Sequence, residues 1–248
     1  MFKDIKSKIS NNIIGNDEKI KISLAAIMSG GHILIEDLPG TGKTTFAKCI
    51  TAALNLDFKR IQFTSDLLPS DILGFNFLLN DNFEIKKGPI FTNIVLADEL
   101  NRASPKTQSA FLEAMEEKSV TIDRDTFKLP DPFIVIATQN PSDLSGTSLL
   151  PESQLDRFMI SFSLDDLTAE QQLNLLKNEN QLEINRNTLF DIKNLIYQKT
   201  ININDVVYKY IQEIKKFIFA KFPEVHISSR CLKQIIAISK SLATINGK

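Results

Sequence analysis

The sequence predicts an α/β core built on a mostly parallel five-stranded sheet with helices on both faces, followed by a small helical domain. Two observations support this fold class. Five short apolar segments recur in the first two-thirds of the 248-residue chain, and helical or turn-rich stretches separate them. After residue 163 no further strand pattern follows, and the sequence is typical of helices. We therefore expect an α/β domain over residues 1–163 and a helical domain over 164–248, without a long linker between them.

The five predicted strands are almost continuously apolar, which is typical of strands that helices cover on both faces. They span residues 32–36, 58–63, 93–98, 133–138 and 158–163. Residues 77–85 and 120–129 instead alternate apolar and polar side chains around a polar turn. Each of these segments predicts a β-hairpin inserted between core elements, with an ordinary connecting loop as the alternative.

The helical region has plausible N-cap residues at Thr188, Asn204 and Ser228. In the segment after Asn204, six apolar residues recur at the i, i+3, i+4, i+7 spacing and predict one apolar helix face. They are Val207, Tyr210, Ile211, Ile214, Phe217 and Ile218.

The composition excludes several classes of protein. Lys and Arg total 29 against 30 Asp and Glu, so the formal net charge is -1, and nonspecific nucleic-acid binding driven by overall charge is not expected. Hydrophobic residues make up 43% of the chain, which excludes a disordered chain.

Cys49 and Cys231 are isolated and predict packing thiols, while His32 and His226 have no partner cluster and predict structural roles. No apolar run reaches membrane-spanning length, so we expect a cytoplasmic protein without a membrane span.

The sharpest motif is the segment Asp-Leu-Pro-Gly-Thr-Gly-Lys-Thr at residues 37–44, which follows the first predicted strand and opens a helix. In such a loop, backbone N–H groups and the helix N-terminus bind phosphate oxygens. Lys43 would reach the outer phosphates, and the Thr44 hydroxyl would ligate Mg²⁺. We therefore expect ATP and Mg²⁺ as ligands. The predicted binding residues of this loop are Leu38, Pro39, Gly40, Thr41, Gly42, Lys43, Thr44 and Thr45.

The motif departs from the phosphate-loop pattern at its first position, where Asp37 replaces the expected Gly. Asp tolerates left-handed backbone better than most residues, so the turn remains possible. The alternative is a glycine-rich loop that matches the pattern by chance.

Polar residues follow three later segments in positions that suit phosphate chemistry. Asp98 and Glu99 end an apolar strand, as expected of a Walker B motif in which Asp98 lies near the metal and Glu99 polarises the attacking water. Asn140 follows another strand and could orient that water, although a turn-forming Asn before Pro141 is the alternative. Arg157 directly precedes the last strand, where it is either a surface ion-pair partner or a cation presented to a neighbouring subunit.

Four segments, at residues 60–71, 88–117, 137–141 and 151–158, resemble the MoxR family of AAA+ ATPases. The resemblance implies a P-loop NTPase core followed by a helical lid. It assigns Lys43 and Thr44 to Walker A, Asp98 and Glu99 to Walker B, and Asn140 to sensor 1. It also assigns Arg157 to the arginine finger that acts on the adjacent subunit, and Arg230 to sensor 2. Ile14 and Gly15 resemble the stretch that covers the adenine. The two hairpins resemble the helix-2 insert and the pre-sensor 1 hairpin. Their aromatic residues Phe77, Phe83 and Phe127 are expected to pack in the core.

The resemblance also implies an ATP-hydrolysing motor that forms a ring of identical subunits. We expect this homo-oligomer to be a hexamer. Its role would be chaperone-like remodelling or activation of a protein client, with a von Willebrand factor A domain protein as partner. Relatives continue past a segment resembling residues 243–247, so we expect either a lid that is naturally short or a sequence that is truncated within it. The alternatives are a nucleotide-gated scaffold with little hydrolysis and a DNA-remodelling, helicase-like protein; the near-zero net charge argues against the second.

Overall fold

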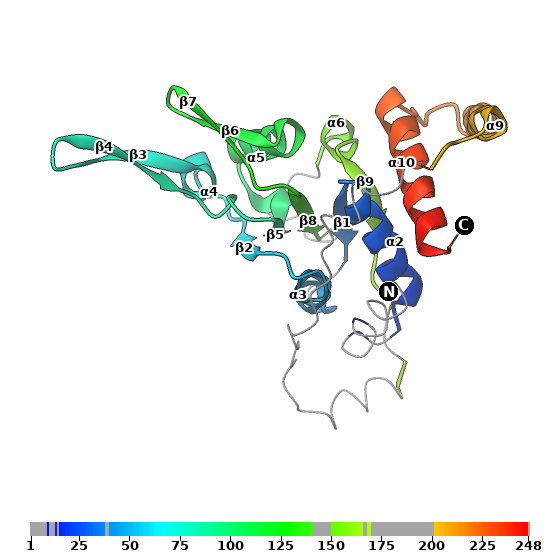
Figure 1. Ribbon diagram of the computed structural model, residues 1–248, viewed down its shortest axis with the longest axis horizontal. Helices are drawn as coiled ribbons and strands as arrows, with labels where there is room; N and C mark the ends of the chain where they lie inside the picture. Colours follow the sequence, from blue (N-terminus) through cyan, green and yellow to red (C-terminus); the bar gives the residue numbers. More distant parts are fainter. Residues whose placement is uncertain are drawn as a thin grey trace.

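A five-stranded parallel sheet forms the centre of the molecule (Figure 1). The computed structural model describes residues 9, 13, 15–37, 40–140, 150–165, 168–169 and 201–247. The strand order is β2 (Phe58–Gln62), β5 (Ile94–Asp98), β8 (Ile134–Gln139), β1 (His32–Glu36) and β9 (Phe158–Phe162), and every neighbouring pair is parallel. The predicted sheet is thus confirmed, with all five strands close to their predicted bounds.

Helices cover both faces of this sheet, which explains why its central strands are apolar throughout. The helices α2 (Asp17–Met28) and α3 (Lys43–Ala53) pack on the face that carries Ile33 and Ile35 of β1. The helix α5 (Pro105–Glu117) packs on the face that carries Leu34. Adjacent strand residues point to opposite faces, so successive side chains of β1 enter two separate hydrophobic clusters.

Two antiparallel hairpins project from the core, as the alternating segments predicted. The first joins β3 (Gly74–Leu79) to β4 (Asn82–Lys87) after the short helix α4 (Pro69–Leu73), and it is longer than predicted. The second joins β6 (Ser119–Ile122) to β7 (Asp125–Lys128) after α5. Figure 1 shows both hairpins pointing away from the helical region at the C-terminal end. Asn76 Nδ2 donates to Asp123 Oδ2 at 2.5 Å and links one hairpin to the other.

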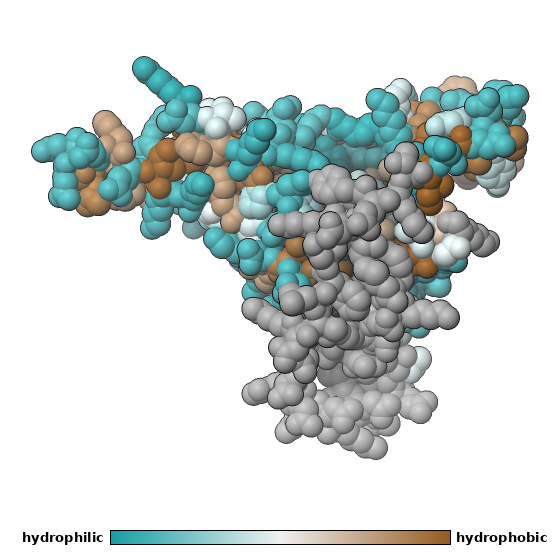
Figure 2. All heavy atoms as spheres, viewed as in Figure 1, coloured by the Kyte–Doolittle hydropathy of each residue, from teal (hydrophilic) through white to brown (hydrophobic). Residues whose placement is uncertain are grey.

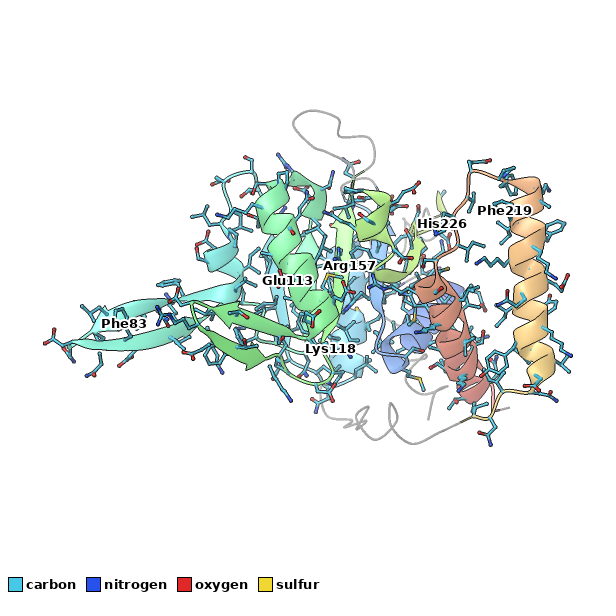
Figure 3. All side chains as sticks on the ribbon, turned by 90° about the horizontal axis from the view of Figure 1, so that it is seen from above. Phe83, Glu113, Lys118, Arg157, Phe219 and His226 are labelled. Carbon is cyan, nitrogen blue, oxygen red and sulfur yellow. The ribbon has the colours of Figure 1, made fainter. Side chains whose placement is uncertain are left out.

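The three hairpin aromatics differ in their surroundings. Phe127 is half-buried against the α5 side of the core, as predicted. Phe77 is half-buried and makes an edge contact with Phe75. The prediction was wrong for Phe83, whose residue surface is 79% exposed near the end of the first hairpin (Figure 3). Figure 2 shows apolar residues gathered along this projecting arm.

The described helical region contains α9 (Asp205–Lys221) and α10 (Ser229–Ile245), and the short α6 (Glu152–Leu155) precedes β9. Two predicted N-caps are confirmed, because the Asn204 side chain accepts from Val206 N and Ser228 Oγ accepts from Cys231 N. Thr188 lies outside the described residues. The helix α10 packs against α2, and a hydrogen bond of 2.8 Å joins Ser29 Oγ to Ser241 Oγ.

The predicted apolar face of α9 is mostly uncovered. Ile211 is buried, whereas Tyr210 and Phe217 are each 66% exposed. The helix therefore forms as its periodicity predicted, but most of its apolar stripe is exposed. The predicted division between residues 1–163 and 164–248 stays a prediction.

Cys49 is buried and Cys231 half-buried, and both are free thiols. Burial raises the pKa of the Cys49 thiol to about 11, as expected of an unreactive packing residue. Within the residues that the structure describes, no helix is both long and apolar enough to cross a lipid bilayer.

Candidate active site

A cleft of about 370 Å³ opens at the carboxyl ends of the central strands, where ligands commonly bind in parallel α/β sheets. Four segments line it: the glycine-rich loop with the start of α3, and the ends of β2, β5 and β8. The lining residues are Gly40, Gly42, Lys43, Thr44, Arg60, Gln62, Asp98, Glu99, Thr138, Gln139 and Asn140. The structure therefore brings together seven of the residues that the sequence predicted for nucleotide chemistry: Gly40, Gly42, Lys43, Thr44, Asp98, Glu99 and Asn140.

The glycine-rich loop depends on left-handed backbone at two positions. Gly40 and Gly42 have φ of 87° and 88°, a region that other residues rarely adopt. A Cβ added at either position would meet no heavy atom within 4 Å, so backbone conformation rather than space favours glycine. Gly42 also caps α3, since Phe46 N donates to Gly42 O at 2.8 Å. The positive end of the α3 dipole therefore lies at the cleft.

Asp37 and Lys43 hold the two ends of this loop together. Lys43 Nζ donates to the carbonyl oxygen of Asp37 at 2.9 Å. Burial lowers the pKa of Lys43, and the negative charges of Asp37, Asp98 and Glu99 oppose that shift. Asp37 is not among the described residues with positive φ, so the left-handed backbone that the sequence argument allowed for is not used. Its side chain instead accepts from Leu164 N at 3.3 Å, just after β9.

The Asp98 carboxylate is buried at the end of β5 and accepts hydrogen bonds at both oxygens. Thr138 Oγ1 donates to Asp98 Oδ1 at 2.6 Å. Arg60 donates to Asp98 Oδ2 from Nε at 3.0 Å and from Nη2 at 2.6 Å. The Arg60 guanidinium thus supplies a positive charge beside the buried carboxylate.

Glu99 has an unusual backbone conformation for a residue with a side chain, with φ of 56° and ψ of 47°. Its N–H donates to Thr138 Oγ1 at 2.9 Å, which holds the turn beside β8. Its Oε2 accepts from Gln62 Nε2 and from Arg102 Nη1, each at 2.9 Å. Strained conformations of this kind are concentrated at functional sites, where they aim a side chain into a cleft.

The sequence reasoning missed three polar residues that organise these carboxylates: Arg60, Gln62 and Thr138. A signal was available for the first two, because they alternate along a strand and therefore share one face. Their role depends on the strand order, because β2 lies beside β5 and so places Arg60 near Asp98 and Gln62 near Glu99. Thr138 likewise acts because β8 lies on the other side of β5.

The cleft provides oxygen donors of the kind that Mg²⁺ prefers. Thr44 and Asp98, the predicted metal ligands, both line it. One carboxylate and one hydroxyl suit Mg²⁺, which usually takes its other ligands from water and substrate phosphates. These residues fit the ion. In the described ranges no group of three or more His, Cys, Asp or Glu side chains could hold a metal by itself.

Arg157 and Arg230 lie away from the cleft, and neither is among its lining residues. Arg157 directly precedes β9, so it lies at the amino edge of the parallel sheet, whereas the cleft lies at the carboxyl edge. Its Nε donates to Glu116 Oε2 at 3.1 Å. Arg230 Nη2 donates to the other oxygen of Glu116. The two arginines are therefore neighbours of each other rather than of the glycine-rich loop.

The remaining predicted binding residues fall into two groups, those outside the described part of the chain and those that are described but are not among the cleft residues. Ile14, Leu38 and Pro39 lie outside the described residues. Thr41 lies in the glycine-rich loop and Thr45 in the first turn of α3, next to lining residues. Gly15 is exposed, with φ of 82°, just before α2. Contact of Ile14 and Gly15 with an adenine ring stays a prediction.

Comparison with known proteins shows which proteins this chain resembles. The ATPase family associated with various cellular activities (AAA) matches residues 32–160, more than half of the chain. YeaC, an uncharacterized protein of Bacillus subtilis, is 50% identical over 170 residues, which are 68% of this chain and 53% of YeaC. Chaperone MoxR1 of Mycobacterium tuberculosis is 32% identical over 257 residues, covering 97% of this chain and 68% of MoxR1. The chain thus spans about half the length of YeaC.

A solved structure gives the same result for the fold. The crystal structure of a candidate ATPase from Cytophaga hutchinsonii superimposes with a TM-score of 0.86 and 36% identity, over 99% of this chain and 80% of that one. Since the family match, the similarity to Chaperone MoxR1 and the shared fold all agree, the chain belongs to the MoxR family of AAA+ ATPases.

Proposed function

We propose that this protein hydrolyses ATP in the presence of Mg²⁺ at a seam between two copies of the chain. One observation carries the proposal. The residues proposed to bind phosphate and to activate water line the cleft at the carboxyl edge of the sheet, while Arg157 lies at the opposite, amino edge. An arginine placed there cannot reach the cleft of its own subunit, but it can face the cleft of a neighbour.

The cleft residues suit a direct attack of water on the terminal phosphate. Glu99 accepts a proton from water as the water oxygen bonds to the γ-phosphorus, and the bond from that phosphorus to the bridging oxygen of ADP breaks. The products are ADP and inorganic phosphate. Asn140 orients the water, and Lys43 holds the phosphate oxygens. When bound, Mg²⁺ neutralises charge on the β- and γ-phosphate oxygens, and Thr44 and Asp98 would hold it.

Arg157 of the adjacent subunit would stabilise the charge on the transferring phosphoryl group. An arginine supplied in this way is worth on the order of 10³ to 10⁵ in rate. We therefore expect an isolated subunit to bind ATP but to hydrolyse it slowly. Mixing Arg157→Ala subunits with Glu99→Gln subunits tests this arrangement, because each variant supplies what the other lacks. If the mixture hydrolyses ATP no faster than either variant alone, the shared site is contradicted.

A second candidate, a nucleotide-gated scaffold with little hydrolysis, is favoured by the contacts of the two acidic residues. Asp98 is paired with Arg60, and Glu99 with Gln62 and Arg102. In the scaffold these contacts would persist, and Asp98 and Glu99 would stay engaged with protein side chains instead of Mg²⁺ and water. Phosphate release by wild type and Glu99→Gln separates the candidates, since a motor requires a large difference and the scaffold predicts equal, low rates.

The biological role extends the same proposal. The name of the relative Chaperone MoxR1 supports chaperone-like remodelling or activation of a protein client. We propose a homo-oligomer, with six subunits as the first arrangement to test, a von Willebrand factor A domain protein as partner, and a cytoplasmic location. Mass measurement of the ATP-loaded Glu99→Gln variant checks the oligomer, and a pull-down with the same variant identifies the client.

A further inference from the structure

Glu116, in the last turn of α5, binds two arginines that come from distant parts of the sequence. Its Oε2 accepts from Arg157 Nε at 3.1 Å, and its Oε1 accepts from Arg230 Nη2. Arg157 belongs to the corner between α6 and β9, which Figure 3 shows beside α5, whereas Arg230 lies in the first turn of α10. One carboxylate therefore fixes the position of each arginine relative to the other.

Neighbouring contacts dock the start of α10 on the same corner. Ser228 Oγ donates to Asp156 Oδ1 at 2.7 Å, and Gln234 Nε2 donates to the Asp156 carbonyl oxygen at 3.4 Å. Arg230 Nη1 lies 3.9 Å from Asp156 Oδ2. Two guanidinium groups brought this close repel each other, so the two carboxylates between and beside them are needed to hold the pair.

The way Arg157 is held leaves it suited to bind phosphate. Its hydrogen bond to Glu116 uses Nε, the donor nearest the main chain. Within the described part of the protein, neither terminal amino group of Arg157 has a recorded hydrogen bond, and the side chain is 26% exposed. A guanidinium fixed at Nε keeps a planar fork of N–H donors for a phosphate group. The hydrogen bond from Arg157 and the positive charge of Arg230 also hold the pKa of the Glu116 carboxyl below its ordinary value.

We propose that Glu116 is a positioning residue that presents Arg157 and Arg230 together to the nucleotide of the neighbouring subunit. This inference rests on the proposed function of Arg157 and adds the group that orients it. Because Arg230 belongs to α10 and Arg157 to the core, the two are aligned only while α10 is docked at the α6–β9 corner. Hydrolysis in one subunit thus depends on the position of α10 in the next.

The first test compares Glu116→Gln with Glu117→Gln in the full chain. Glu117 is the adjacent exposed residue, and within the described residues it has no recorded hydrogen bond or ion pair. Loss of the Glu116 charge should lower kcat on the order of 10- to 100-fold, the effect of a small misplacement of a reacting group. The dissociation constant for ATP should stay unchanged, because the subunit's own cleft lies at the opposite edge. The Glu117 variant should keep wild-type turnover. Wild-type kcat in Glu116→Gln would overturn the inference.

A mixing experiment shows whether Glu116 acts across the seam. Glu116→Gln subunits keep an intact cleft, and Glu99→Gln subunits keep correctly held arginines, so the mixture should recover turnover. Failure to recover would place the effect of Glu116 within its own subunit and refute the inference. In an Arg157→Ala background, Glu116→Gln should cause a smaller further loss than it does in wild type, because only the placement of Arg230 remains to be lost; a full additional loss would mean that Glu116 does not act through Arg157.

These outcomes separate the two proposals. Wild-type turnover in Arg157→Ala would refute the shared site itself, whereas an inactive Arg157→Ala together with a fully active Glu116→Gln would refute only the role of Glu116.

Thermal unfolding checks that each variant is folded. If Glu116→Gln does not fold, Glu116→Asp serves instead, because it keeps the charge but withdraws the carboxylate by one methylene. It should show reduced kcat that recovers on mixing, and unreduced kcat would again overturn the inference.

Discussion

His32 makes the stability of this protein depend on pH in a way that the structure predicts. It is the first residue of β1 and is buried. Val135 N donates to His32 Nδ1 at 3.0 Å, so the ring proton is on Nε2, which lies 3.2 Å from the Met115 carbonyl oxygen. This neutral tautomer satisfies both ring nitrogens. Burial of the ring lowers the pKa of His32 from 6.5 to about 4.

The direction of the effect follows from proton linkage. Above pH 6.5 the ring is neutral in both the folded and the unfolded chain, and the full stability is present. Between pH 6.5 and about 4 the unfolded chain binds a proton that the folded protein does not, so stability is lost as the pH falls. The difference between the pKa of His32 in the unfolded chain and in the folded protein contributes roughly 3 kcal/mol to the free energy of unfolding at neutral pH. Lowering the pH to about 5 removes roughly 2 kcal/mol of this contribution.

Urea unfolding of wild type, His32→Asn and His226→Gln at about pH 7 and about pH 5 measures this contribution. In the His32→Asn variant, the side-chain oxygen can still accept from Val135 N, but no imidazole remains to titrate. The variant should be less stable than wild type at the higher pH, and the difference should shrink by roughly 2 kcal/mol at the lower pH. His226 is exposed, so its variant should follow wild type at both. A difference between wild type and His32→Asn that stays the same at both pH values would refute the reasoning.

Three further predictions concern the cleft and the first hairpin. Lys43→Ala should abolish ATP binding in calorimetry, because it removes the cation at the phosphate loop; unchanged affinity would mean that the loop is misassigned. Arg60→Ala should lower the Mg²⁺ concentration needed for half-maximal turnover, since Asp98 loses the guanidinium that competes with the ion, and an unchanged requirement would count against that competition. Gly88→Ala should destabilise the protein by about 2 kcal/mol in urea unfolding, because the added Cβ would collide with the Ile72 carbonyl at the base of the β3–β4 hairpin. Its affinity for ATP should not change, and wild-type stability would show that the hairpin base can shift to accommodate the methyl group.

Local patterns predicted the elements well where one physical cause dominates. Strands buried on both faces need continuous apolar residues, so β1, β5 and β8 were identified close to their ends. Asn204 and Ser228 are N-caps because a short side-chain acceptor satisfies the free N–H groups of the first turn. Periodicity was less informative about burial. It predicted a helix at α9, but it did not reveal that most of its apolar stripe would lie uncovered.

The residues of the β3–β4 hairpin also show that a sequence pattern predicts an element better than it predicts burial. Alternation of apolar and polar side chains predicted the β3–β4 hairpin, yet Phe83 is exposed because the hairpin projects beyond the core that its apolar residues would otherwise meet. The sequence pattern of the hairpin does not predict how far the hairpin extends from the sheet. That depends on the packing of α4 and α5 at its base.

The sequence alone determined the α/β class and the identities of Lys43, Thr44, Asp98, Glu99 and Asn140 as cleft residues, because each follows or ends a recognisable strand and parallel strands share a carboxyl edge. Tertiary structure alone decided which side chains hold those groups. Arg60 reaches Asp98 through strand order, and Glu116 meets Arg230 across 114 positions of sequence. Contacts between distant segments follow from packing of whole elements, whereas a motif encodes only the backbone geometry within its own few residues.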